Sequence, residues 1–206
     1  MKMKNDYHLV LVDGSSYLFR AYHALPDLIS SKGQPTGAIK GTISMIRKLI
    51  SDYPDSELVV VFDAKGKTFR NEIYSEYKAN RPAMPEDLRS QISIIQDIVS
   101  LMGLPMLSVF GVEADDVMGT LSAQASKKKL NTLISTMDKD LAQLVSPSVT
   151  LLNTMTGDIL DELAVKEKFG VRPDQIIDYL ALVGDSVDNI PGVPKCGPKT
   201  AVKWLR

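Results

Sequence analysis

The chain has 206 residues, a formal net charge of −1 and 44% hydrophobic residues, which is ordinary for a soluble globular protein and indicates no partner by bulk charge. The single cysteine, Cys196, excludes an intrachain disulfide and a disulfide-stapled secreted scaffold. No stretch approaches the roughly 18 apolar residues of a membrane span, and the apolar run after residues 1–6 is too short for a signal peptide, so we expect a cytoplasmic protein with no membrane partner.

Apolar runs typical of buried strands alternate along the chain with amphipathic patterns typical of helices. In chain order they predict a strand at 9–12, helices at 15–24 and 37–50, a strand at 58–62, a polar basic segment at 64–85, a helix at 86–102, a strand at 105–109, a helix at 113–125, a strand at 130–136, a short helix at 138–144 and a strand at 149–153. From residue 161 onward the pattern is helical. Strands separated by helices predict an α/β fold, with a mostly parallel central sheet flanked by helices.

Acidic residues stand where the predicted strands end or the predicted helices begin. The nine carboxylates in question are Asp13, Asp63, Glu113, Asp115, Asp116, Asp138, Asp140, Asp185 and Asp188. Ligands of open α/β sheets bind beyond the carboxyl ends of the strands, so carboxylates that end several strands would converge there. Each group taken alone could be a helix cap or a turn residue, but capping explains all of them together less well.

The residue types in this set favour particular cations. No histidine lies near any of these groups in the sequence and the cysteine is distant, so all-oxygen ligands favour Mg²⁺ or Mn²⁺ over zinc. So many like charges suppress one another's ionisation unless cations compensate them. A pair of ions about 3.5–4 Å apart can clamp the attacking and leaving oxygens of a phosphodiester, so the pattern favours phosphoryl hydrolysis.

Residues 64–85, which we call the basic strap, combine cations with aromatic rings. The cations are Lys65, Lys67, Arg70, Lys78 and Arg81, with Phe69, Tyr74 and Tyr77 interleaved and only two acids between residues 64 and 81. Basic residues neutralise phosphates and aromatic rings stack on unpaired bases. A solvated surface loop is the alternative, but a cationic strap beside an anionic metal site favours a nucleic-acid substrate passing between them.

Turn-forming residues are dense between 184 and 201, and the segment from Lys195 to Arg206 has four basic residues and no acid. A glycine-containing turn at a helix start exposes backbone N–H groups to phosphate. The pattern predicts a helix–turn–helix that grips a duplex backbone without reading bases, with a plain helical corner as the alternative.

With these motifs in this order, the sequence resembles the N-terminal 5′ nuclease (5′-3′ exonuclease) domains of bacterial DNA polymerase I, within the flap endonuclease superfamily. The matching segments are VDGSSYLFRAY at 12–22, VFDAKGKTFR at 61–70, YKANRP at 77–82, GVEADD at 111–116 and the run 184–200. The resemblance implies a nuclease core of the PIN-like or resolvase-like kind at 1–160, with the strap as a helical arch. It implies the start of a C-terminal helical DNA-binding subdomain at 161–206.

The resemblance also implies roles for single residues. One metal group would comprise Asp13, Asp63, Glu113, Asp115 and Asp116, and a second would comprise Asp138, Asp140, Asp185 and Asp188. Among these, Asp13, Asp63 and Asp116 would be catalytic together with Lys78 and Arg81, which would contact the scissile phosphate. The remaining DNA contacts would be Arg20, Arg70, Tyr77, Gly192, Lys195, Gly197, Lys199 and Thr200, with Tyr77 stacking on the terminal base.

The activity implied is hydrolysis near the single-strand/duplex junction of a 5′ flap by two Mg²⁺ or Mn²⁺ ions, in RNA primer removal and DNA repair. The implied partner is flap, nicked or gapped DNA or an RNA–DNA primer junction, bound by a nucleoid-associated monomer with a K⁺ ion at the helical hairpin. A polymerase domain attached in the native chain is also implied. The resemblance implies that further helices follow Arg206, so we expect the sequence to be part of a longer domain.

Two positions depart from the family pattern. Lys195 stands where the family has glycine in the phosphate-binding turn, and Met137 stands beside Asp138 where a small residue is usual. Glycine permits a positive φ that lysine tolerates poorly, so we expect either an altered turn or an added charge at Lys195. Crowding at Met137 is expected near the second metal group.

Other classes fit the residues less well. A catalytically silent DNA-junction binding module is the main alternative, but such a module gains nothing from nine carboxylates near DNA. A haloacid-type phosphohydrolase needs an aspartate two residues after Asp13, where Ser15 stands. A dinucleotide-binding domain needs a glycine-rich turn after the first strand, which is absent here.

Overall fold

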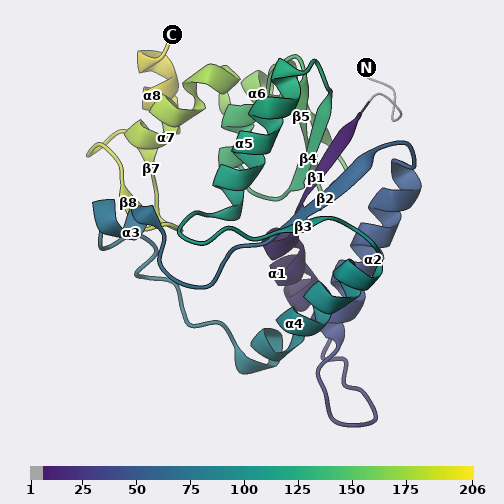
Figure 1. The fold of residues 1–206 in the computed structure, drawn as a ribbon. Helices are drawn as coiled ribbons and strands as arrows, with labels where there is room; N and C mark the ends of the chain where they lie inside the picture. Colours follow the sequence, from purple (N-terminus) through teal and green to yellow (C-terminus); the bar gives the residue numbers. More distant parts are fainter. Residues whose placement is uncertain (1–6) are drawn as a thin grey trace.

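A computed structural model of the protein describes residues 7–206, and its centre is a six-stranded sheet with the strand order β3-β2-β1-β4-β5-β6 (Figure 1). The strands are β1 (Leu9–Asp13), β2 (Glu57–Val61), β3 (Met106–Leu107), β4 (Thr132–Thr136), β5 (Val149–Asn153) and β6 (Ile159–Leu160). All neighbouring pairs are parallel except β5 with β6. This arrangement confirms the predicted mostly parallel α/β fold.

Helices cover both faces of the sheet. They are α1 (Gly14–Ala24), α2 (Gly37–Asp52), α3 (Phe69–Ile73), α4 (Glu86–Leu101), α5 (Ala114–Lys127), α6 (Glu162–Phe169), α7 (Ile176–Val183) and α8 (Pro198–Trp204), with the 3₁₀ turns η1 (Asp140–Leu144) and η2 (Pro173–Gln175). Among residues 7–206, no helix is both long enough and apolar enough to span a bilayer.

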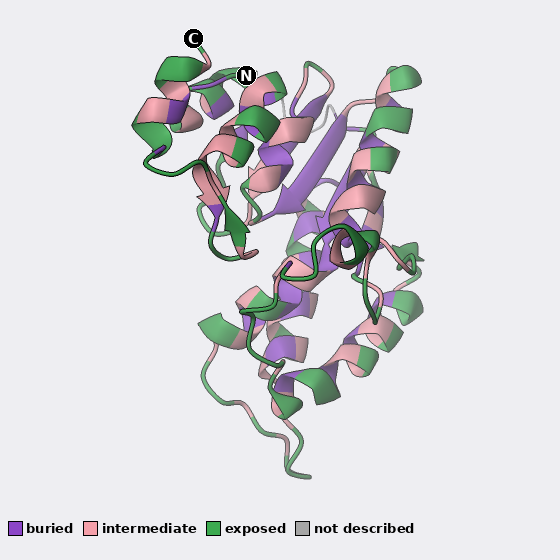
Figure 2. Ribbon diagram, turned by 90° about the vertical axis from the view of Figure 1, so that its left-hand side faces the viewer, coloured by how far each residue is buried: buried purple, intermediate pink, exposed green. Residues whose placement is uncertain are grey.

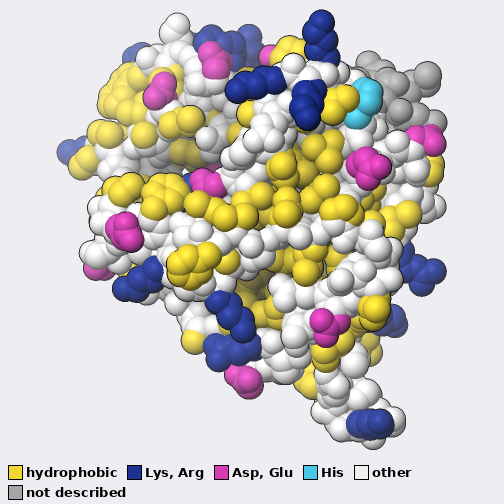
Figure 3. Space-filling view, in the orientation of Figure 1, with side chains coloured by type: hydrophobic (Ala, Val, Ile, Leu, Met, Phe, Trp, Pro, Cys, Tyr) yellow, Lys and Arg dark blue, Asp and Glu magenta, His cyan; other side chains and the backbone are white. Residues whose placement is uncertain are grey.

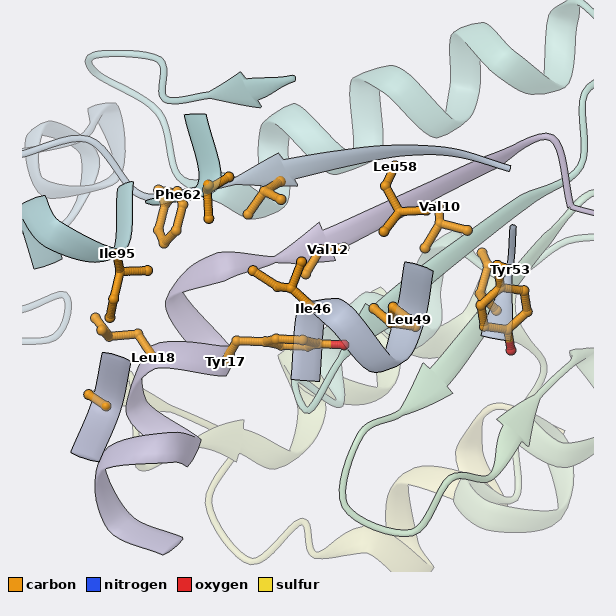
Figure 4. Close-up of a cluster of buried hydrophobic side chains, with 14 of the residues drawn as sticks. Val10, Val12, Tyr17, Leu18, Ile46, Leu49, Tyr53, Leu58, Phe62 and Ile95 are labelled. Carbon is orange, nitrogen blue, oxygen red and sulfur yellow. The ribbon is translucent and has the colours of Figure 1, made fainter. Parts of the chain in front are cut away.

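The core lies in two layers, one on each face of the sheet, because successive side chains of a strand point to opposite faces. Val10 and Val12 of β1 pack with α1, α2 and α4, as the buried cluster in Figure 4 shows. Leu11, between them, packs on the other face with α5, η1 and the C-terminal helices. The central strand β1 is therefore buried on both sides (Figure 2), which explains why it reads as a continuous apolar run.

The strand order places the site. β1 is hydrogen-bonded to β2 on one side and to β4 on the other, and the chain proceeds outward in opposite directions from this point. In open α/β sheets, ligands bind outside the carboxyl ends of the strands where the order reverses in this way. Asp13 ends β1 and Thr136 ends β4, so both lie at this crevice.

Some predicted elements differ from the structure. The C-terminal part is not helical throughout, because β7 (Gly184–Asp185) and β8 (Ile190–Pro191) pair as a short antiparallel hairpin. The predicted strand at 105–109 is reduced to the two residues of β3, since this edge strand has β2 as its only partner in the sheet. The antiparallel edge strand β6 was not predicted, because two residues carry too little periodicity. Of the helical arch that the resemblance implies at residues 64–85, the structure forms only the single-turn helix α3, which is followed by turns.

Candidate metal centre

Asp13 is the buried carboxylate at the centre of the candidate site. It ends β1, and its side chain caps α1 by accepting a hydrogen bond from the Ser16 N–H (2.9 Å). Its other oxygen accepts a hydrogen bond from the Thr136 hydroxyl at the end of β4 (2.7 Å). Burial raises the pKa of Asp13 to about 6, against the lowering effect of these two hydrogen bonds. A buried acid with this pKa marks a place where a cation would be favourable.

The start of α5 brings a second set of acids to the same crevice. Glu113 is the N-cap residue of α5 (Ala114–Lys127). The Asp116 side chain accepts a hydrogen bond from the Glu113 N–H (2.9 Å), which completes a capping box. Asp63, after β2, accepts a hydrogen bond from the Ala114 N–H (2.9 Å), so it too lies at the helix N-terminus. Some of these acids therefore take part in capping at the start of α5, and that helix start lies beside the strand ends.

Asp115 shows that carboxylates of several elements face one another. Burial raises its pKa to about 8, and the charges of neighbouring carboxylates add to this effect. Those neighbours are Asp138, Asp13, Asp63 and Glu113, in order of decreasing effect. We call the nine predicted carboxylates together the acidic cluster. With no cation bound, the cluster therefore keeps some of its carboxyl groups protonated, which reduces its negative charge.

A second group of acids lies beside β7. Burial, followed by the charges of Asp138 and Asp185, raises the pKa of Asp140 to about 6. One carboxylate oxygen of Asp140 is buried and accepts no hydrogen bond within the described part of the chain. Lys139 forms an ion pair with Asp185 (3.0 Å). Burial alone would raise the pKa of Asp185, but hydrogen bonds from Lys139 and the Val187 N–H lower it on balance.

Cations of the basic strap also sit on acids of the cluster. Lys78 donates to Glu113 (2.8 Å) and lies 3.8 Å from Asp188, and Arg81 pairs with Asp188. Figure 3 shows Lys and Arg side chains at the lower left of the molecule, where Figure 1 has the loop between α3 and α4. The segments predicted to hold metal and phosphate are thus in direct contact with each other.

Arg70 forms a two-pronged pair with Asp116. Its two terminal nitrogens lie 2.6 and 2.8 Å from the carboxylate oxygens, and its guanidinium stacks on the Phe69 ring (4.7 Å). The hydrogen bonds from Arg70 hold the pKa of Asp116 below its usual value. Asp116 is therefore neutralised by the protein itself, unlike Asp115.

Tyr77 has a different environment from the one expected for a stacking residue. Its side chain is only 7% exposed, and its hydroxyl donates toward Glu113 (2.9 Å) and Asp188 (3.1 Å). Burial and these two charges raise its pKa, so it remains a donor. In this conformation the ring is not available to a base, and it links the strap to two acids instead.

The acidic cluster fits divalent cations by its donor chemistry. All of its side-chain donors are oxygens, several of its pKa values are raised by burial and, to a smaller extent, by mutual repulsion, and one buried Asp140 oxygen accepts no hydrogen bond within the described residues. Within residues 7–206, no three His, Cys, Asp or Glu side chains are arranged closely enough to hold an ion as they stand. Hard cations would therefore need side-chain adjustment, including displacement of the cations of Lys78, Arg81 and Lys139.

Residues 184–192, which we call the ring, form a loop that is closed at its base. Gly184 has φ +78°, and a Cβ atom built on it would lie 2.3 Å from the Gly192 nitrogen. A Cβ on Gly192 would lie 2.3 Å from the Val183 carbonyl group. The backbones cross so closely that only glycine fits at either position. The ring carries Asp185 and Asp188 to the cluster.

Lys195 keeps the turn that glycine would adopt. Its φ is +66°, in the left-handed region, so the expected strain is present and the turn is not altered into a right-handed form. Gly197 is the N-cap residue of α8, and Lys199 is exposed on the first turn of that helix. Lys195, which precedes the helix, is also exposed. Thr200 is half-buried, with its N–H bonded to the Gly197 carbonyl (3.0 Å).

The structure places the remaining predicted residues around this centre. Arg20 donates to the Thr154 carbonyl, on the β5–β6 turn. Met137 is half-buried; its N–H donates to Ser16 Oγ (3.2 Å), and it lines a small cavity with Asp138 and other residues. The sequence reasoning missed Lys139 and Thr136. The alternation of acid and base at 138–140 was a signal for the lysine, whereas Thr136 looked like an ordinary strand residue.

The sequence matches two family descriptions that together span residues 8–206. One is the 5′-3′ exonuclease N-terminal resolvase-like domain over residues 8–170, and the other is the 5′-3′ exonuclease C-terminal SAM fold over residues 171–206. DNA polymerase I of Pseudomonas aeruginosa is 61% identical over 197 residues, covering 96% of this chain and 22% of that protein. A 5′-3′ exonuclease of Buchnera aphidicola is 48% identical over 203 residues, covering 98% of this chain and 67% of that protein.

The fold is similar to solved structures. A bacteriophage T5 flap endonuclease, solved as a pseudo-enzyme-product complex with DNA and metal ions, has a TM-score of 0.78 and 26% identity and covers 96% of this chain and 74% of that chain. The T5 5′-exonuclease with bound divalent metal ions (zinc) has a TM-score of 0.79 at the same identity and coverage.

Proposed function

Since the chain belongs to the 5′-3′ exonuclease family, we propose that it is a structure-specific 5′ nuclease that hydrolyses phosphodiester bonds near the single-strand/duplex junction of 5′ flaps. The observation that carries this proposal is the meeting of the acidic cluster with the basic strap at the carboxyl ends of β1, β2 and β4. The family assignment supports the reaction type. Removal of RNA primers and repair of DNA are the processes that such a reaction would serve.

Two groups of acids would hold two divalent cations, Mg²⁺ or Mn²⁺. The first comprises Asp13, Asp63, Glu113 and Asp115, with Asp116 bound to Arg70, and the second comprises Asp138, Asp140, Asp185 and Asp188. When bound, such cations activate water and neutralise charge that develops on the phosphate. The T5 protein solved with DNA and metal ions supports this assignment.

The side chains of the strap would bind and orient the scissile phosphate. Lys78 and Arg81 already face acids of the cluster, so a phosphate entering between the two segments would meet both cations. Arg70, which spans Asp116 and Glu113, would fix the strap to the start of α5. Tyr77 would keep the two acids it contacts in place through its hydroxyl.

The turn between the ring and α8 would hold the duplex. Lys195 and Lys199 project exposed charges on either side of Gly197, which suits contacts to successive phosphates without base readout. A K⁺ ion at this turn is part of the proposal. The chain spans 22% of the Pseudomonas DNA polymerase I that it matches, so a following polymerase domain is likewise proposed.

Cleavage of an end-labelled 5′-flap duplex tests the function. We expect Mg²⁺-dependent cutting at the junction, abolished by chelator and by Asp13→Asn, which removes the most central carboxylate. Asp97→Asn, on an exposed position of α4, is the matched control and should cut normally. Binding of the flap without metal-dependent cutting would contradict the proposal and favour a silent junction-binding module.

A further inference from the structure

Two segments that are far apart in the sequence lie against each other at the edge of the acidic cluster. They are residues 76–81 of the basic strap and residues 186–189 of the ring. Three hydrogen bonds to backbone carbonyls join them: Lys78 N–H to the Asp188 carbonyl (2.9 Å), Asn80 Nδ2 to the Ser186 carbonyl (2.8 Å), and Asn189 Nδ2 to the Glu76 carbonyl (2.7 Å). The Tyr77 hydroxyl also donates to the Asp188 carboxylate (3.1 Å). The two asparagines act in opposite directions, one from the strap to the ring and one from the ring to the strap.

These three bonds differ in kind from the ion pairs beside them. The pairs of Lys78 and Arg81 with Glu113 and Asp188 use charged groups and carboxylate oxygens. The three bonds use only amide donors and backbone carbonyls. A cation or phosphate that takes over the carboxylates or the strap cations therefore leaves the three bonds intact. Salt also screens the ion pairs far more than it screens neutral hydrogen bonds.

The backbone at this contact is held in an uncommon conformation on both sides. Lys78 has φ +57° and Asn189 has φ +58°. Side chains other than glycine rarely adopt this region, and asparagine is among those that tolerate it best. Such conformations persist where the surrounding contacts fix them. Here the left-handed turn at Lys78 points its N–H at the ring, and that at Asn189 points its amide at the strap.

We propose that Asn80 and Asn189 are positioning residues that latch the basic strap onto the ring. The latch keeps the strap cations beside the acidic cluster when a divalent cation or a substrate phosphate displaces their ion pairs. The strap and the ring, which carries Asp185 and Asp188, then move as one unit. The inference rests on the proposed function only for the identity of the groups that displace the ion pairs.

Hydrogen exchange measured by mass spectrometry tests the latch on the 206-residue protein without DNA or metal. The double variant Asn80→Ala with Asn189→Gly removes both side-chain donors, and glycine suits the positive φ at 189. Each net hydrogen bond corresponds to about a fivefold change in an opening equilibrium, so amides of residues 77–81 should exchange about 25-fold faster. Lys129→Gly, at another left-handed position after α5 (φ +60°), is the control and should leave the strap unchanged.

Salt gives a signature that simple loss of stability does not. In the unmodified protein, protection of residues 77–81 should change less than about twofold on raising NaCl to roughly 1 M, where the screening length is about 3 Å. In the double variant the ion pairs remain with only the Lys78 N–H bond and the Tyr77 hydroxyl bond, so the same salt should remove more of the residual protection than it does in the unmodified protein. Addition of Mg²⁺ should likewise lower the protection of residues 77–81 more in the double variant than in the unmodified protein.

Unchanged exchange of residues 77–81 in the double variant would overturn the latch. Equal acceleration of the strap and of the central strands would also overturn it, because the effect would then be global unfolding. Neither readout requires cleavage. A protein that latches its strap but cuts no flap would therefore refute the proposed function and leave the latch standing.

Discussion

Asp115→Asn should stabilise the metal-free protein at mildly alkaline pH. Burial and the charges of Asp138, Asp13, Asp63 and Glu113 raise the pKa of Asp115 from 3.8 to about 8. A raised pKa in the folded state means that the protonated form is favoured there. The contribution of Asp115 to the free energy of unfolding is therefore fully present below about pH 4 and is lost as the pH rises through about 8. Asparagine has no proton to lose and keeps the neutral form throughout.

The size of the effect follows from that pKa. Each pKa unit corresponds to about 1.4 kcal/mol, so the shift sets a ceiling of about 5 kcal/mol at pH 8. Much of the shift comes from burial, and the rest comes from neighbouring carboxylates such as Asp13, whose own pKa burial raises to about 6. Because coupled acids divide such an energy among themselves, we expect Asp115→Asn to gain about 2–3 kcal/mol.

Urea unfolding in the presence of chelator measures this gain. The free energies of unfolding of the original protein and Asp115→Asn should converge toward about pH 4 and separate as the pH rises. Added Mg²⁺ should restore the original protein and have a smaller effect on the variant. Asp97→Asn is the control for loss of an ordinary surface carboxylate. An Asp115→Asn protein that is equally or less stable at about pH 8 would show that the cluster is not under electrostatic strain.

Three further substitutions examine other parts of the site. Lys195→Gly should change the free energy of unfolding by less than about 1 kcal/mol, because relief of the positive φ and the greater chain entropy of glycine offset each other. Its affinity for a flap substrate should fall more than its single-turnover rate does. Equal affinities of the two proteins would refute a charge contribution from the lysine. Gly192→Ala should lower the free energy of unfolding in urea by more than about 3 kcal/mol, because its Cβ would lie 2.3 Å from backbone atoms. Gly197→Ala is the control and should be nearly neutral, because its Cβ meets open space. Similar losses in the two variants would show that the backbone crossing at Gly184 and Gly192 relaxes. Thr136→Val should cost about 1–2 kcal/mol and raise the pKa of Asp13 further, because that acid loses a hydrogen bond from a buried hydroxyl, and an unchanged pKa by NMR titration would argue against the bond.

The sequence was sufficient to predict the sheet and most of the helices that cover it. The run at residues 9–12 packs on both faces of the sheet, so its apolar character is visible in the sequence without any need for context. The strands β6, β7 and β8 were not predicted, because two residues carry no periodicity and the β7–β8 hairpin depends on close glycine contacts.

The acids of the site were predicted more fully than their neighbours were. Asp13 and Asp63 follow strands directly, so local patterns and the rule on strand ends were enough. The role of Tyr77 could not be predicted, because its hydroxyl donates to Glu113 and Asp188, which are distant from it in the sequence. Lys195 was flagged by the sequence as a departure, but only the backbone angle could show that the turn persists.

Because its base is closed, the ring is a loop whose two ends are held together by its own backbone contacts. The crossing of Gly184 with Gly192 and the pairing of β7 with β8 fix both ends of the loop independently of its contents. The entropic cost of lengthening a loop with fixed ends grows only slowly, so residues between these ends can be exchanged or inserted without displacing α7 or α8. Loops of other lengths can therefore be grafted between these two ends while the sheet that carries Asp13 is retained.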